Sequence, residues 1–88
     1  MKVQNMQSPR GTTVANQFEI ITDEGVYFQS YSTIIAFRPR SGKIQLDADK
    51  WDYPKTTSKY RNIFLRMTTK EVEAKIKSGE IELVDLNK

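Results

Sequence analysis

The segment from Trp51 to Leu65 contains the residue types best suited to binding an anion. If a helix begins within this segment, the free backbone N–H groups and partial positive charge of the helix N-terminus attract negative groups. Hydroxyl and cationic side chains nearby would add further donors. We therefore expect contact with nucleic-acid phosphates, through the candidate anion-binding residues Lys55, Thr56, Thr57, Ser58, Lys59 and Arg61, beside the aromatic candidates Trp51, Tyr53 and Tyr60.

The same residues also fit a purely structural role. Thr57 or Ser58 can cap the helix, because a hydroxyl accepts a hydrogen bond from the first-turn N–H groups. Trp51 and Tyr60 can close the hydrophobic core, since a small domain depends on its few aromatic side chains. The sequence leaves both interpretations open.

A basic turn is the second candidate, because Pro39, Ser41 and Gly42 favour a tight reversal of the chain. Its basic residues are Arg38, Arg40 and Lys43, and a basic hairpin tip can contact phosphates. Turns are also polar simply because they are exposed.

Tyr27, Tyr31 and Phe37 form a third set of candidates. On an open sheet face they would resemble the stacking aromatic residues of single-strand binders. On the covered face they would belong to the core under the helices.

The composition argues against an enzyme. There is no histidine, the commonest general base and metal ligand at neutral pH, and no cysteine. Asp47, Asp49 and Asp52 lack the glycine and final glutamate of a calcium loop. We therefore expect no catalytic residues, no metal site and no cofactor.

The absence of cysteine also favours a location in the reducing cytoplasm. No apolar run approaches the length of a membrane span.

The charge is distributed unevenly along the chain. The segment from Arg38 to Lys70 has nine basic and three acidic residues, whereas the remainder has five basic and eight acidic residues. A central excess of positive charge with interleaved aromatic residues favours nucleic-acid binding.

The hydrophobic periodicity predicts one α+β domain over residues 14–88, preceded by a flexible arm at residues 1–13. Alternating apolar residues predict an antiparallel meander of about four strands, at residues 17–22, 26–30, 33–37 and 43–46. A helical stripe predicts a helix over residues 58–66. A capping box at Thr68 and Glu71 predicts a second helix that ends at Ser78-Gly79, followed by a strand that includes Ile81, Leu83 and Val84.

Five sequence stretches resemble an uncharacterised family of small proteins encoded by bacteriophages and related mobile elements. They are VANQF (14–18), EG-x-YFQSY-x-x-IIA (24–36), KIQLD-x-x-x-WDY (43–53), TT-x-KYR-x-x-FL (56–65) and KIKSGE (75–80). The most distinctive of them is TT-x-KYR-x-x-FL, within a WDY-x-x-TT-x-KYR-x-x-FL core. The resemblance implies a phage context and a non-catalytic accessory role, and it carries no biochemical activity.

Two functions follow as expectations. The first is a nucleic-acid-binding accessory protein in the cytoplasm of the host cell. The alternative is a protein-binding module, either an inhibitor or modulator of a host or defence protein or a small assembly component. A homodimer formed through an edge strand or an aromatic face is compatible with both.

Overall fold

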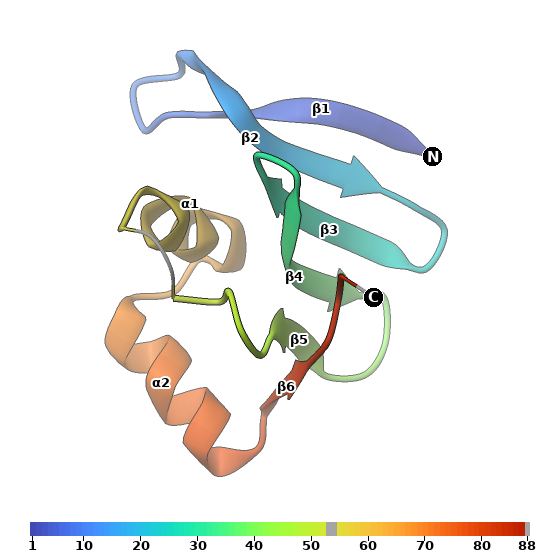
Figure 1. Cartoon of the computed structure of the whole chain (residues 1–88), viewed down its shortest axis with the longest axis vertical. Coiled ribbons are helices and arrows are strands. Elements are labelled where there is room, and N and C mark those ends of the chain that lie inside the picture. The colour runs from blue at the N-terminus through green and yellow to red at the C-terminus, as the bar shows by residue number, and fades with distance from the viewer. Residues whose placement is uncertain (53–54, 88) are drawn as a thin grey trace.

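The computed structural model describes residues 1–52 and 55–87, which form one six-stranded sheet and two helices (Figure 1). The strands lie in sequence order across the sheet. Five antiparallel strands come first, and β6 then pairs parallel with β5. The bounds are β1 (Lys2–Gln7), β2 (Thr13–Ile21), β3 (Gly25–Ser30), β4 (Thr33–Pro39), β5 (Ile44–Asp47), α1 (Lys55–Leu65), α2 (Thr69–Ser78) and β6 (Ile81–Val84).

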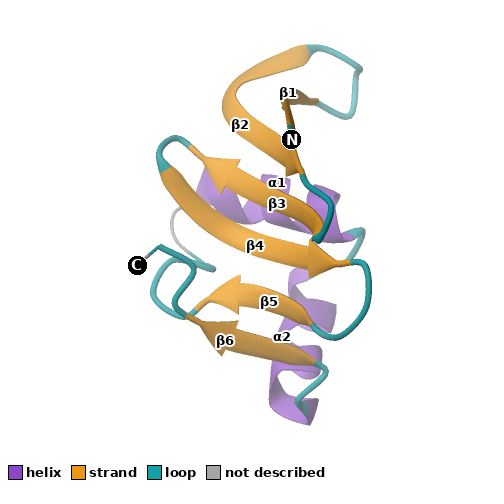
Figure 2. Ribbon diagram, turned by 90° about the vertical axis from the view of Figure 1, so that its right-hand side faces the viewer, coloured by secondary structure: helices purple, strands orange, loops and turns teal. Residues whose placement is uncertain are grey.

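The parallel pairing of β5 with β6 explains where the helices lie. Two parallel neighbours need a long crossover connection, and α1 and α2 provide it. Both helices therefore cover the same face of the sheet and leave the other face open (Figure 2). The expected α+β class, with a meander followed by two helices and a last strand, is confirmed.

Residues 1–13 differ from the flexible arm that the sequence suggested. Lys2–Gln7 forms the edge strand β1, which pairs with β2 and buries Met6 to 5% exposure. The hydrophobic pattern of the sequence does not indicate this strand, because most of its exposed side chains are amides. The meander consequently has five strands before the helices, and β2 begins at Thr13 instead of Gln17.

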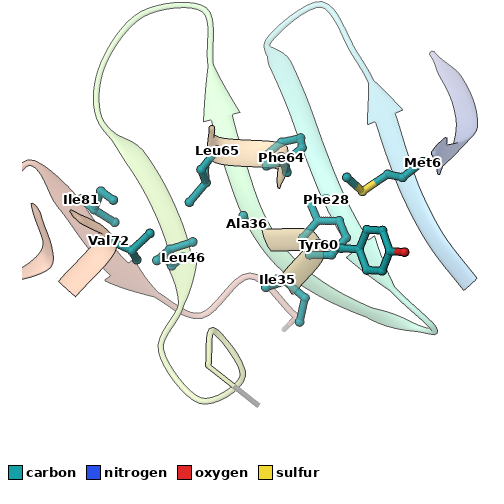
Figure 3. Close-up of a cluster of buried hydrophobic side chains, with 10 residues drawn as sticks. All are labelled: Met6, Phe28, Ile35, Ala36, Leu46, Tyr60, Phe64, Leu65, Val72 and Ile81. Atoms are coloured by element: carbon teal, nitrogen blue, oxygen red, sulfur yellow. The ribbon is translucent and has the colours of Figure 1, made fainter. Parts of the chain in front are cut away.

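The core lies between the sheet and the two helices (Figure 3). Phe28, Ala36 and Leu46 come from three neighbouring strands, and Phe64 stacks on Phe28 with ring centroids 5.7 Å apart. The remaining members of the cluster are Met6, Ile35, Tyr60, Leu65, Val72 and Ile81. Ile35 joins them because the β3–β4 register shifts at Phe28 and Gln29, which leaves Ile35 as an extra residue.

Tyr27 and Phe37 occupy the open face, since each alternates with a core residue of its strand. Their rings stack with centroids 4.3 Å apart. Tyr31 instead lies in the β3–β4 turn, 60% exposed and at a positive φ of 56°. Tyr27 and Phe37 are therefore not part of the core beneath the helices. Tyr31 is not next to them on the open face, so the three aromatic residues do not form one surface.

Two local predictions are confirmed in detail. Thr68 and Glu71 form the expected capping box at the start of α2, and these hydrogen bonds lower the pKa of Glu71. Gly79 ends the helix in the left-handed conformation.

At the β2–β3 hairpin, a Cβ on Gly25 would collide with the carbonyl oxygen of Arg38, so glycine is required there.

The burial of Met6 predicts that β1 contributes to global stability. Met6→Ala should lower the free energy of unfolding by about 2–4 kcal/mol, because it leaves a cavity in the core. Val3→Ala, on the same strand but 55% exposed, is the matched control and should change it by less than about 0.5 kcal/mol. Urea denaturation measures both, and equal small effects would show that β1 detaches from the domain.

Candidate binding groove between the helices

Helix α1 divides its residues between the core and an outward stripe. Tyr60 and Phe64, four residues apart, are buried against the sheet. Lys55, Ser58, Lys59 and Asn62 follow the i, i+3, i+4, i+7 spacing of a single helix face. The helix begins at Lys55, three residues before the expected start, so Ser58 lies within the helix and does not cap it.

This outward stripe borders a hollow of about 630 Å³ between α1 and α2. A second hollow of about 520 Å³ adjoins it, and Trp51 and Glu73 line both. We call the two together the Trp51 groove. Its lining residues are Trp51, Asp52, Lys55, Ser58, Lys59, Arg61, Asn62, Thr69, Glu73, Ala74, Ile76 and Lys77.

The structure thus brings together five of the sequence-predicted candidates: Trp51, Lys55, Ser58, Lys59 and Arg61. Thr56 and Thr57 do not line the groove. Thr57 is 1% exposed and shares a hydrogen bond of 2.9 Å with the hydroxyl of Ser30. It therefore fastens α1 to β3 and is not available to a ligand.

Arg61 is fully buried and makes its hydrogen bonds inside the protein. Its Nη1 donates to the carbonyl of Trp51 at 2.7 Å, and Nε and Nη2 both donate to Oδ1 of Asn62. Nη2 also lies 3.3 Å from the hydroxyl of Thr69, and the guanidinium is 5.2 Å from the centre of the Trp51 ring. The structural interpretation thus applies to Arg61, which joins the chain before α1 to both helices.

The charge of Arg61 is balanced only at a distance. Burial lowers its pKa, while the negative charges of Asp52 and Glu73 partly oppose that effect. Within residues 1–52 and 55–87 the guanidinium forms no ion pair with either carboxylate. The polar hollow thus contains three cationic side chains, Lys55, Lys59 and Arg61, and two carboxylates, Asp52 and Glu73, which leaves a net charge of +1.

The other basic candidates lie elsewhere. Arg38 donates through Nη1 to the carbonyl of Phe64 at 2.7 Å, at the C-terminal end of α1, and its guanidinium covers the Phe64 ring. Arg40 is exposed where β4 ends, and Lys43 is exposed just before β5. Lys55 begins α1 and lies about 15 Å along the helix from its end. Arg38, Arg40 and Lys43 therefore do not line the Trp51 groove.

Two aromatic candidates have different outcomes. Tyr60 is a core residue with 6% exposure, and the ammonium group of Lys59 lies 5.4 Å from the centre of its ring. Tyr53 lies outside the described residues.

Asp47 has a structural role that the sequence did not reveal. It is buried at the end of β5, where its carboxylate accepts hydrogen bonds from the backbone N–H of Lys50 and Leu86 and from the side chain of Asn87. Only the fold brings Leu86 and Asn87 to this strand end. Over the described part of the chain, no three acidic residues gather as metal ligands do.

The internal bonds of Arg61 predict a large effect on stability. Arg61→Ala should reduce the free energy of unfolding by about 3–5 kcal/mol, because the Trp51 carbonyl and the Asn62 side chain lose their donor. Arg61→Lys should recover only part of this loss, since an ammonium group lacks the planar fork. Lys55→Ala is the exposed control and should have almost no effect. Denaturation with guanidinium chloride measures these changes. An unchanged unfolding midpoint for Arg61→Ala would contradict the structural role of Arg61.

None of the helices in the described residues is both long and apolar enough to cross a membrane. No curated protein and no solved structure is significantly similar to the chain. Residues 1–81, which include β1 and every helix, match a family whose description is a family of unknown function (DUF8033). The match covers most of the 88 residues, so the chain belongs to this family.

Proposed function

We propose that this protein is a non-catalytic binding module that holds an acidic, extended segment of another protein in the Trp51 groove. The observation that carries the proposal is the position of Trp51. Trp51 lines both a polar hollow, with Lys55, Ser58 and Lys59, and a more apolar one beside Ala74 and Ile76.

The two ends of the groove suit the two kinds of side chain in such a segment. Lys55 and Lys59 attract carboxylates, while Ala74, Ile76 and the Trp51 ring accept an aliphatic side chain. A tryptophan surrounded by polar groups is also typical of the residues that dominate protein interfaces. The groove therefore offers both charge complementarity and an apolar anchor.

Nucleic acid is the second candidate, because Trp51 and the two lysines can stack a base and contact phosphates. Two observations make it weaker. Asp52 and Glu73 lie in the wall of the groove and would repel a backbone that carries a charge at every nucleotide, whereas the separate carboxylates of a peptide can be spaced to meet Lys55 and Lys59. Arg38 does not line the groove, and Arg61 makes its hydrogen bonds inside the protein.

The resemblance to phage and mobile-element proteins suggests where the proposed module acts and on what kind of partner. In the cytoplasm of a host cell, a small module of this kind would inhibit or modulate a host or defence protein. It would alternatively join two parts of a larger assembly.

Selection from a random peptide library on the immobilised protein tests the groove. Peptides rich in aspartate and glutamate, with at least one aliphatic residue, should be enriched. The double variant Lys55→Glu, Lys59→Glu should weaken their binding at least about tenfold, because two attractive charges become repulsive. Fluorescence anisotropy of a labelled selected peptide measures the dissociation constant.

The matched control is the double variant Arg40→Glu, Lys43→Glu, which makes the same charge change outside the groove and should leave peptide affinity unchanged. A labelled single-stranded oligonucleotide provides the competing probe. If it binds tightly with a steep salt dependence while no acidic peptide is selected, the protein proposal is wrong and the nucleic-acid function replaces it.

A further inference from the structure

A separate hollow of about 500 Å³ lies on the helix side of the sheet, where β1 and β2 approach the C-terminal end of α1. The polar side chains that carry the argument are Gln4, Gln7, Glu19, Arg38 and Arg66. We propose that this hollow binds an oxyanion, a carboxylate or a phosphate group, between Arg38 and Arg66. The site shares no lining residue with the Trp51 groove, so the inference is independent of the proposed function.

The backbone of Arg66 is the first argument. Helix α1 ends with hydrogen bonds from the N–H of Met67 to the carbonyl of Asn62 and from the N–H of Arg66 to that of Ile63. This arrangement places Arg66 at φ 59°, in the left-handed conformation that glycine usually supplies. An arginine here carries a cost that glycine would avoid, and such strain is concentrated at functional sites. The strain is explained if the side chain is needed in the hollow.

Arg38 supplies the second cation in a fixed orientation. Its Nη1 donates to the carbonyl of Phe64, and its Cζ lies 4.6 Å from the centre of the Phe64 ring. A guanidinium has five N–H donors in a planar fork, so other donors remain to meet two oxygens of one anion. The side chain is therefore preorganised before any ligand arrives.

The charge of the hollow favours an anion. Its wall contains two arginines and one carboxylate, that of Glu19, which accepts a hydrogen bond of 3.2 Å from the side chain of Gln4. Across residues 1–52 and 55–87, neither arginine forms an ion pair with an acidic group. Glu19 thus reduces the net positive charge without neutralising either arginine.

Titration of the ¹⁵N-labelled protein with sodium phosphate and, separately, with sodium succinate tests the site. We expect saturable shifts of the side-chain amides of Gln4 and Gln7 and of the arginine Nε–H signals. Saturation by phosphate alone assigns a phosphate site, and saturation by succinate alone or by both assigns a carboxylate or general oxyanion site. The absence of saturable shifts with both anions would overturn the proposal.

Variants with opposite expected effects separate this site from general attraction to a basic protein. Arg66→Gly should raise the melting temperature by a few degrees, since the strain is removed, yet weaken anion binding about tenfold. Glu19→Gln should strengthen binding several-fold, because a repulsive charge is lost. Arg40→Gln, which removes an exposed arginine outside the hollow, and Trp51→Ala should leave binding unchanged. Equal weakening by Arg66→Gly and Arg40→Gln would overturn the proposal.

Discussion

The buried guanidinium of Arg61 fixes the part of the molecule on which the candidate groove depends. It joins the Trp51 carbonyl, where the chain leaves the sheet, to Asn62 of α1 and Thr69 of α2. A buried cation is expensive unless its donors are satisfied, so these three partners must stay where they are. The Trp51 ring and the walls of the groove are therefore held by the same contacts that satisfy Arg61.

The sheet imposes the complementary constraint. Because β6 pairs parallel with β5, the helices must cross one face, and they fix their position there with contacts at both ends of α1. Thr57 bonds Ser30 near its start, and Arg38 binds the Phe64 carbonyl near its end. Thr57 is thus used to dock the helix, whereas Arg38 docks it through one N–H group and keeps its other donors for the proposed anion site. The outward stripe of α1 keeps Lys55, Ser58 and Lys59 for the groove.

The sequence predicts the features that depend on neighbours in the chain. The capping box at Thr68 and Glu71, the glycine cap at Gly79 and the apolar face of α1 all follow from local spacing, and all are present. The sequence does not predict β1, because its pairing with β2 is a long-range contact and its side chains give almost no hydrophobic signal. The bonds of Arg61 and Asp47 depend on residues that only the folded chain brings together. The sequence also does not indicate the left-handed backbone of Arg66, since a positive φ at a non-glycine residue has no sequence pattern.

The chain has a single tryptophan, and Trp51 lines both hollows, so its fluorescence reports on the groove. The most direct measurement is its fluorescence emission during titration with a selected acidic peptide, at low and at high salt. The account predicts a saturable blue shift with the same dissociation constant as the anisotropy of the labelled peptide, weaker at high salt because the lysine contacts are screened. Peptide binding that leaves the Trp51 emission unchanged would contradict it, because the peptide would then occupy another surface.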